Sequence, residues 1–200
     1  MKLTIIGASG HGRVIADAAI LSGYQEIEFL DDNPKITECG GFPVTGPSAD
    51  CTAKDNDIII GIGNAAIRKT LSEKYADRSM PVIVHPHAAV SDTARVGRGT
   101  VVMAGAVINS TAVIGRGCII NTCSSVDHDC ILGDYVHVAV GAHVCGNVLI
   151  GSETWIGAGS TVINNVSICE RCVIGAGAVV IRDITEPGTY VGVPAKRLKA

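Results

Sequence analysis

Branched aliphatic residues recur at a fixed interval through the second half of the chain. From Val84 to Val180, every sixth residue is isoleucine, leucine or valine, at seventeen consecutive positions. The fourth residue after each of them is no larger than valine, from Thr100 to Ala178. This hexapeptide pattern predicts a parallel β-helix, in which three short strands form each 18-residue coil around a narrow core. Glycine recurs at the coil spacing, at Gly97, Gly115, Gly133 and Gly151.

A different pattern covers the first 83 residues, where short apolar runs alternate with helical segments. Strands are expected at 2–6, 26–30, 57–60 and 82–84, and helices at 13–22 and 65–75. Strands that alternate with helices are typical of a small, Rossmann-like parallel α/β unit. We therefore expect an N-terminal α/β lobe, residues 1–83, followed by a β-helix with a C-terminal tail, residues 84–200.

Charge and hydropathy exclude two broad classes of function. The net charge is −3, without the basic excess of a nucleic-acid-binding protein. No apolar run approaches the ~20 residues that span a bilayer, and the N-terminus lacks the apolar core and cleavage site of a signal peptide. We expect a cytoplasmic protein. Because flat, weakly charged β-helix faces would expose apolar surface in a monomer, we also expect threefold self-association.

The cysteines do not predict a metal site. All eight are scattered, and Cys169 and Cys172 form the only CxxC pair. The hexapeptide register points Cys172 into the core and places Cys169 just after an inward residue, so the two are expected to face apart. We therefore expect neither metal binding nor redox chemistry from this pair.

A glycine-rich segment between the first strand and its helix is the first binding candidate. Gly7, Gly10 and Gly12 form a GxxGxG turn, and Asp31 follows about 20 residues later, where a ribose-binding carboxylate belongs. Free N–H groups at a helix start bind phosphate. A lobe this short predicts a one-nucleotide pocket that also includes Asp32 and the 63–64 turn. The alternative is that these glycines only make tight turns.

Six motifs along nearly the whole chain resemble one family. They are Gly7-Ala-Ser-Gly-His-Gly12, Phe29-Leu-Asp-Asp32, Ile62-Gly-Asn64, Asn121-Thr-Cys-Ser-Ser-Val126, His128-Asp129-Cys130 and Val191-Gly-Val-Pro-Ala-Lys196. Together they resemble the bacterial sugar acetyltransferases of the left-handed β-helix superfamily, and most closely the UDP-4-amino-sugar N-acetyltransferases of bacillosamine synthesis. The resemblance implies a left-handed β-helix, acetyl-CoA as donor, and a homotrimer with active sites between subunits.

A histidine followed by an acid is the main catalytic candidate. His128 and Asp129 fall at a corner of the predicted prism, outside its core. Acetylation of an amine needs a base as nitrogen attacks the thioester carbonyl, and a histidine oriented by a carboxylate suits that task. Taken alone, such a pair could also be a solvated surface pair. The resemblance assigns His128 as general base and Asp129 as its support, in a direct transfer without an acyl-enzyme.

The resemblance also assigns two sets of binding residues. Acetyl-CoA would contact His137 through its acetyl carbonyl, and Gly146, Ala158 and Ala176 along the pantetheine groove. The nucleotide sugar would contact Ser9, Gly10, His11, Asp31, Asp32 and Gly63. Lys196 and Arg197 either meet the CoA phosphates or form a solvated basic tail.

Three functions therefore stay open at this point. The favoured one is an acetyl-CoA-dependent N-acetyltransferase that acts on the 4-amino group of a UDP-4-amino-4,6-dideoxy-N-acetylhexosamine. A second is O-acetylation of a sugar such as sialic acid, whose enzymes share a two-lobe layout. The third, of another class, is a scaffold that binds a nucleotide sugar without catalysis.

Overall fold

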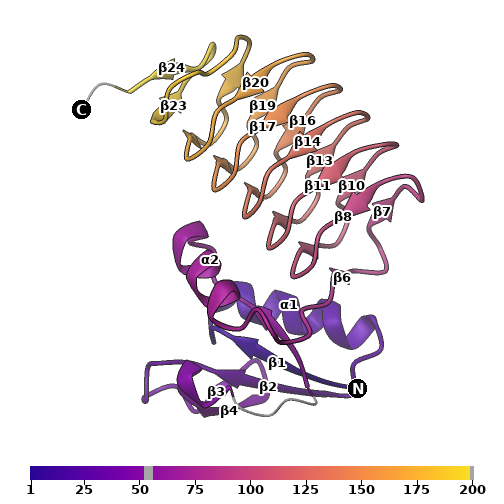
Figure 1. Cartoon of the computed structure of the whole chain (residues 1–200), viewed down its shortest axis with the longest axis vertical. Helices are drawn as coiled ribbons and strands as arrows, with labels where there is room; N and C mark the ends of the chain where they lie inside the picture. Colours follow the sequence, from indigo (N-terminus) through magenta and orange to yellow (C-terminus); the bar gives the residue numbers. More distant parts are fainter. Residues whose placement is uncertain (52–55, 199–200) are drawn as a thin grey trace.

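The chain folds into an α/β lobe and a parallel β-helix, which confirms the predicted fold class. The structure is a computed structural model that describes residues 1–51 and 56–198. In Figure 1 the β-helix stands on the lobe, and helices α1 (Gly10–Leu21) and α2 (Ala65–Lys74) lie between the lobe sheet and the coils. No helix in the described part of the chain is long and apolar enough to cross a membrane.

The lobe contains one five-stranded sheet in the order β3-β4-β2-β1-β5. Its strands are β1 (Lys2–Ile6), β2 (Glu26–Leu30), β3 (Glu38–Cys39), β4 (Phe42–Gly46) and β5 (Asp57–Ile60), and a short 3-10 helix covers Ser48–Asp50. β1 pairs in parallel with β2 and β5, and β2 with β4, whereas β3 is antiparallel to β4. The sequence pattern missed β3 and β4 because one is only two residues long and the other carries a proline and no fully buried residue.

Two boundaries differ from the sequence prediction. Helix α1 begins at Gly10, three residues early, because the Ser9 side chain caps it by accepting a hydrogen bond from Gly12 N at 3.3 Å. The glycine segment is thus partly the first helical turn. A Cβ at Gly12 would lie 2.3 Å from Gly7 O, so only glycine fits there. The strand expected at 82–84 is β6 (Ile83–Val84), which pairs with the β-helix and not with the lobe sheet.

Three faces form the β-helix, and neighbouring strands within each face are parallel except β24, which is antiparallel to β23. The eight-stranded face comprises β6, β9 (Val101–Val102), β12 (Ile119–Ile120), β15 (His137–Val138), β18 (Trp155–Ile156), β21 (Val173–Ile174), β23 (Thr189–Val191) and β24 (Lys196–Arg197). The six-stranded face comprises β7 (Ala89–Val90), β10 (Val107–Ile108), β13 (Ser125–Val126), β16 (His143–Val144), β19 (Thr161–Val162) and β22 (Val179–Val180). The five-stranded face comprises β8 (Arg95–Val96), β11 (Val113–Ile114), β14 (Ile131–Leu132), β17 (Leu149–Ile150) and β20 (Ser167–Ile168). Strand pairing is offset by 18 residues, as Ile120 opposite Val138 shows, so the predicted coil length is confirmed.

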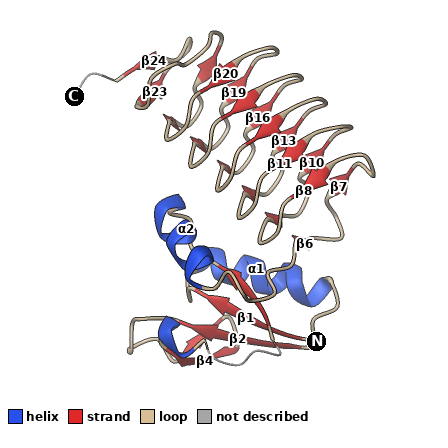
Figure 2. Ribbon diagram, viewed as in Figure 1, coloured by secondary structure: helices blue, strands red, loops and turns tan. Residues whose placement is uncertain are grey.

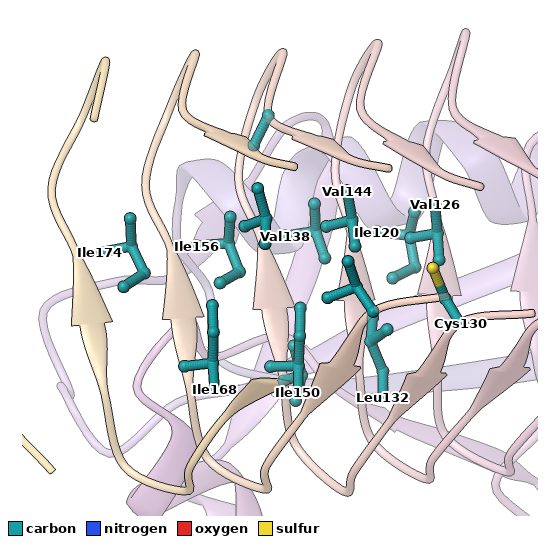
Figure 3. Packing of buried hydrophobic residues seen from close by; sticks show 14 of the residues in the cluster. Ile120, Val126, Cys130, Leu132, Val138, Val144, Ile150, Ile156, Ile168 and Ile174 are labelled. Carbon is teal, nitrogen blue, oxygen red and sulfur yellow. The ribbon is translucent and has the colours of Figure 1, made fainter. Parts of the chain in front are cut away.

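The core of the β-helix is built from the two predicted inward series. Figure 3 shows aliphatic side chains from all three faces meeting along the axis, with the Cys130 thiol among them. The thiols of Cys118 and Cys172 are also fully buried at the small inward position. A continuous column of close-packed aliphatics makes this domain a rigid support for its corners.

The lobe packs on the first coils through α1. Buried residues of α1, such as Ile15 and Ala19, share one apolar cluster with Ile83, Val101 and Ile119 of the eight-stranded face. Figure 2 shows α1 and α2 between the lobe strands and the coils. The eight-stranded face is therefore the surface on which the lobe sits.

The CxxC pair is arranged differently from the prediction. Cys169 Sγ lies 3.4 Å from Cys172 Sγ, so the expectation that the two side chains face apart is wrong. Arg171 between them has a φ of 55°, and this left-handed residue folds the turn so that both thiols meet at the corner. Both cysteines are free, and no cluster of three potential metal ligands occurs among the described residues.

Candidate active site

His128 and Asp129 lie together at the corner between β13 and β14. His128 Nδ1 is 2.8 Å from Asp129 Oδ2, and both side chains are exposed. Asp129 adopts a φ of 59°, which turns its side chain back toward the preceding ring. Since the carboxylate accepts from Nδ1, the proton sits there and the lone pair is on Nε2. The corner thus presents an imidazole with a basic nitrogen.

The charges around His128 favour its protonated form. The hydrogen bond with Asp129 raises the pKa of His128 above 6.5, and the nearby charge of Asp127 adds to this. Asp129 is held ionised, since hydrogen bonds from Thr111 and then from His128 lower its pKa. Thr111 Oγ1 donates to Asp129 Oδ1 at 2.6 Å from one coil earlier. Three side chains in a row therefore orient and activate one nitrogen.

Gly146 leaves the space in which the His128 ring lies. A Cβ at Gly146 would come within 2.6 Å of both Cε1 and Nε2 of His128. Gly146 lies 18 residues after His128, at the same corner of the next coil, and Asn147 N donates to His128 O there at 2.9 Å. A glycine at this place permits the ring to rest on the backbone of the next coil.

His137 lies on the eight-stranded face and has the opposite electrostatic character. Burial lowers its pKa to about 3, and the charge of Arg68 and the electrostatic interaction with His11 add to this. Its Nε2 is 3.1 Å from Asn121 Nδ2, and Asn121 Oδ1 already accepts from Thr122 N at 2.8 Å. The amide nitrogen is therefore the donor, and His137 is neutral with its proton on Nδ1.

Three rings line up where the lobe meets the coils. The centroid of His137 is 6.3 Å from that of His11 and 6.1 Å from that of Trp155, with interplanar angles of 28° and 30°. Burial and the charge of Arg68 lower the pKa of His11 to about 4. His11 Nε2 is buried and has no hydrogen-bond partner among the described residues. Trp155 is 46% exposed and forms the open end of the row.

The predicted nucleotide residues meet at one edge of the lobe sheet. Asp31 Oδ2 accepts from Ala8 N at 2.8 Å, which joins the end of β2 to the glycine segment. Ser9 Oγ donates to Gly61 O at 3.4 Å, which joins that segment to the turn after β5. Asp32 turns away to accept from Ser48 N, and this hydrogen bond lowers its pKa. The carboxylate of Asp31 thus shapes the loop.

A cleft of about 590 Å³ opens between the start of α2 and the eight-stranded face. Its walls are Gly63, Asn64, Ala65, Ala66, His137, Glu153, Thr154, Trp155, Arg171 and Val173. Asn64 caps α2 by accepting from Ile67 N, so the first N–H groups of that helix face this region. A residue predicted for the nucleotide sugar and one predicted for acetyl-CoA therefore line one cavity.

Comparisons with known proteins identify the family. The PglD N-terminal domain model matches residues 2–75, and the bacterial transferase hexapeptide model matches residues 147–182. The acetyltransferase domain of PglB from Neisseria gonorrhoeae FA1090, also solved with acetyl coenzyme A, is 42% identical, with a TM-score of 0.95 and coverage of 98% of this chain and 99% of that one. The chain belongs to the acetyl-CoA-dependent sugar N-acetyltransferases. The resemblance seen in the six motifs is thereby confirmed.

Two further relatives describe the range of this N-acetyltransferase family. PerB from Caulobacter crescentus, solved with CoA and GDP-perosamine, is 34% identical over 100% of this chain and 98% of its own, with a TM-score of 0.94. UDP-N-acetylbacillosamine N-acetyltransferase of Bacillus subtilis strain 168 is 37% identical over 111 residues. That alignment spans 52% of this chain and about half, 51%, of the curated relative.

Within one chain, the residues predicted to bind acetyl-CoA do not all lie next to one another. Gly146 is at the corner after the six-stranded face, beside His128. Ala158 and Ala176 are exposed at the corner after the eight-stranded face, where Gly177 N donates to Ala158 O. At the C-terminal end, Arg197 forms an ion pair with Glu186. The predicted groove is thus divided between two corners of the prism.

Three residues of this N-acetyltransferase were missed by the sequence analysis. Trp155 could have been recognised from the sequence, because it is the only tryptophan and occupies an outward position just before inward Ile156. Thr111 could also have been recognised, because it lies 18 residues before Asp129 and therefore occupies the same corner of the adjacent coil. Arg68 gave no such signal, because two of its four hydrogen-bond partners, Gly117 and Tyr135, lie on coils far along the chain.

Proposed function

We propose that the protein transfers the acetyl group of acetyl-CoA directly to the 4-amino group of a UDP-4-amino-4,6-dideoxy-N-acetylhexosamine. His128 is the general base and Asp129 orients it. The amine nitrogen attacks the thioester carbonyl, the C–N bond forms, and the C–S bond breaks as the CoA thiolate leaves. His128 takes the amine proton and returns it to the thiolate, so that the amide and CoA are the products.

The observation that carries this proposal is the His128–Asp129 corner. In the neutral form of this exposed His128 ring, the lone pair is on Nε2 beside Gly146, while Nδ1 donates to the ionised carboxylate of Asp129. A general base needs an open approach and surroundings that favour uptake of the proton; the exposed ring provides the first, and Asp129, which raises the pKa of His128, provides the second. A scaffold without catalysis has no use for a glycine that makes room for this ring.

Neutral His137 suits the carbonyl side of the reaction. With Nε2 accepting from Asn121, its Nδ1–H is free to donate to the acetyl oxygen, where negative charge develops. Its low pKa keeps it in this donor-acceptor form throughout the physiological range. This supports the acetyl-CoA role that the sequence resemblance gave it.

The lobe supplies the acceptor side. The buried, unpartnered His11 Nε2 suits a hydrogen bond to substrate, and Ser9, Gly10, Asp31, Asp32 and Gly63 form or border the loop edge beside it. The relatives named above act on or bind nucleotide-linked amino sugars, a UDP sugar in one case and a GDP sugar in another. A nucleotide sugar that enters through the 590 Å³ cleft would bring its sugar toward the coils.

Two subunits are needed to complete the site. His128 lies at one corner of the prism, and His137 and Ala158 lie on or beside another face. The five-stranded face exposes an apolar stripe, one residue per coil, at Val113, Ile131 and Leu149. Burial of this stripe in a homotrimer would set the His128 corner of one subunit against the groove of its neighbour.

Thiol release from acetyl-CoA tests the proposal. The purified protein is assayed with a UDP-4-amino-4,6-dideoxy sugar and, separately, with free sialic acid. Release only with the UDP-amino sugar is expected. Release only with sialic acid would assign hydroxyl acetylation instead, and silence with both, despite acetyl-CoA binding by calorimetry, would overturn the acceptor.

A further inference from the structure

Arg68 of α2 is the largest fully buried side chain among the residues that the structure describes, at 1% exposed. Its guanidinium crosses the junction between the two domains. Nε donates to Gly117 O at 2.6 Å and Nη2 to Tyr135 O at 2.8 Å, both on turns of the β-helix. Nη1 donates to Ile62 O and Gly63 O, both at 2.9 Å, on the turn after β5.

All four acceptors are backbone carbonyls, and Arg68 forms no ion pair among the described residues. A buried cation without a carboxylate is costly, and burial lowers the pKa of Arg68 to about 10. A lysine could not replace it, because only a planar guanidinium reaches carbonyls on opposite sides at once. Helix stability alone does not explain such a residue, since methionine or leucine would fill the space at lower cost.

We propose that Arg68 is a positioning residue for the acceptor substrate, which fixes the Ile62–Gly63 turn against the coils that carry His137. This inference rests on the proposed function, in which that turn borders the nucleotide sugar. Arg68 holds the carbonyls of Ile62 and Gly63, and Gly63 and the next residue, Asn64, line the cleft. A loss of the clamp would therefore shift the loop and the lobe, and leave the CoA side of the coils in place.

The charge of Arg68 also bears on the two buried histidines. After burial, which is the larger cause in both, the positive charge of Arg68 lowers the pKa of His11 and of His137. The other titratable groups that face Arg68 are Cys118 and Tyr135. Removal of the cation lets both histidines protonate at a higher pH, whereas a lysine at this position keeps the charge and loses the geometry.

Three variants test the proposal on the full chain: Arg68→Met, Arg68→Lys and, as matched control, Lys69→Ala. Lys69 is the next residue of α2 and crosses the same junction on the surface, where Nζ lies 2.8 Å from Glu153 Oε1. For Arg68→Met we expect KM for the UDP-amino sugar to rise about 10- to 100-fold, the range for loss of hydrogen bonds from a charged donor. KM for acetyl-CoA stays within about twofold.

The contrast between the two KM values separates positioning from simple loss of stability. In both Arg68→Met and Arg68→Lys KM for the sugar rises, whereas the acid limb of the pH profile, which His128 sets, stays in place. Equal rises in both KM values, an unchanged sugar KM, or equal behaviour of Lys69→Ala would overturn the proposal. If Arg68→Met does not fold by circular dichroism, Arg68→Lys decides through the KM values alone.

Calorimetry distinguishes this inference from the proposed function. If the wild type binds the UDP-amino sugar but does not acetylate it, the proposed reaction is wrong, and the same variants are compared by sugar affinity. Weaker binding in Arg68→Met and Arg68→Lys, but not in Lys69→Ala, would still support the clamp. A wild type that does not bind the sugar would overturn both.

Discussion

At the corner between β13 and β14, His128 is exposed, hydrogen-bonded to a carboxylate, and has a raised pKa. At the junction between the lobe and the eight-stranded face, His11 and His137 are buried beside a cation, and their pKa values are lowered to about 4 and about 3. The first region favours the protonated imidazole. The second keeps both imidazoles neutral near neutral pH.

The difference follows from solvent and from the sign of the neighbouring charge. Water and Asp129 stabilise the imidazolium at the corner, whereas burial and Arg68 oppose it at the junction. The same side chain is therefore suited to proton transfer in one place and to neutral hydrogen bonding in the other. Residue type alone gave three histidine candidates, and their surroundings divide the roles.

The largest expected effect on catalysis comes from replacing the exposed histidine, His128. His128→Gln removes the base and should lower kcat by about two to four orders of magnitude, the usual share of general base catalysis. Because the side chain is exposed, the thermal midpoint should not move. Unchanged turnover in steady-state thiol release would remove His128 from catalysis, and a large loss of stability would make the result structural.

The two buried histidines, His11 and His137, should make the stability of the protein depend on pH. Below pH 6.5 the unfolded chain protonates His11 and His137 while the folded protein does not, so the free energy of unfolding falls as pH falls from about 6.5 toward about 4. Each neutral histidine contributes a slope of about 1.4 kcal/mol per pH unit in that window. His137→Gln should flatten the urea-unfolding profile by one such slope.

His128→Gln is the matched control for that measurement. Its histidine has a raised pKa, so the folded state already binds the proton and the acid-side slope should not flatten when it is replaced. Equal slopes for the wild type and His137→Gln would show that His137 is protonated in the folded protein.

The two regions also differ in how far the sequence could predict them. The corner follows from the 18-residue register, because strict repetition fixes which residues share a corner; the register placed His128 and Asp129 there, whereas Gly146 was assigned through the family resemblance. The junction does not follow from the register, because no repeat relates α2 to the β-helix turns that lie 49 and 67 residues beyond Arg68. Arg68 was missed for that reason. The register fails only where a residue leaves it, as at Cys169, whose side chain turns over the corner.

Gly146→Ala tests the position of the His128 ring, because it should move the ring without removing it. The backbone of Gly146 does not need a positive φ, but the new Cβ would lie 2.6 Å from His128 Nε2 and must displace the imidazole. We expect a fall in kcat of about 10- to 100-fold, because a base out of reach of its proton loses most of its effect. Asn164→Ala, at the same corner one coil on and exposed, should be neutral in the same assay. Equal activity of the two variants would mean that the ring has another resting place.

Thr111→Val should give the smallest change, because it acts on His128 through Asp129. Valine keeps the β-branched shape at a φ of 62° and loses only the hydroxyl that donates to Asp129 Oδ1. Asp129 stays ionised near neutral pH without it, so kcat should fall only about two- to fivefold. Asp129→Asn sets the upper bound for the loss of kcat, at about tenfold. It should also move the acid limb of kcat to lower pH, because the pKa of His128 then falls toward 6.5. If Thr111→Val shifted that limb as far as Asp129→Asn does, the carboxylate would depend on Thr111 for its charge, and the corner would be a three-residue unit rather than a pair with a support.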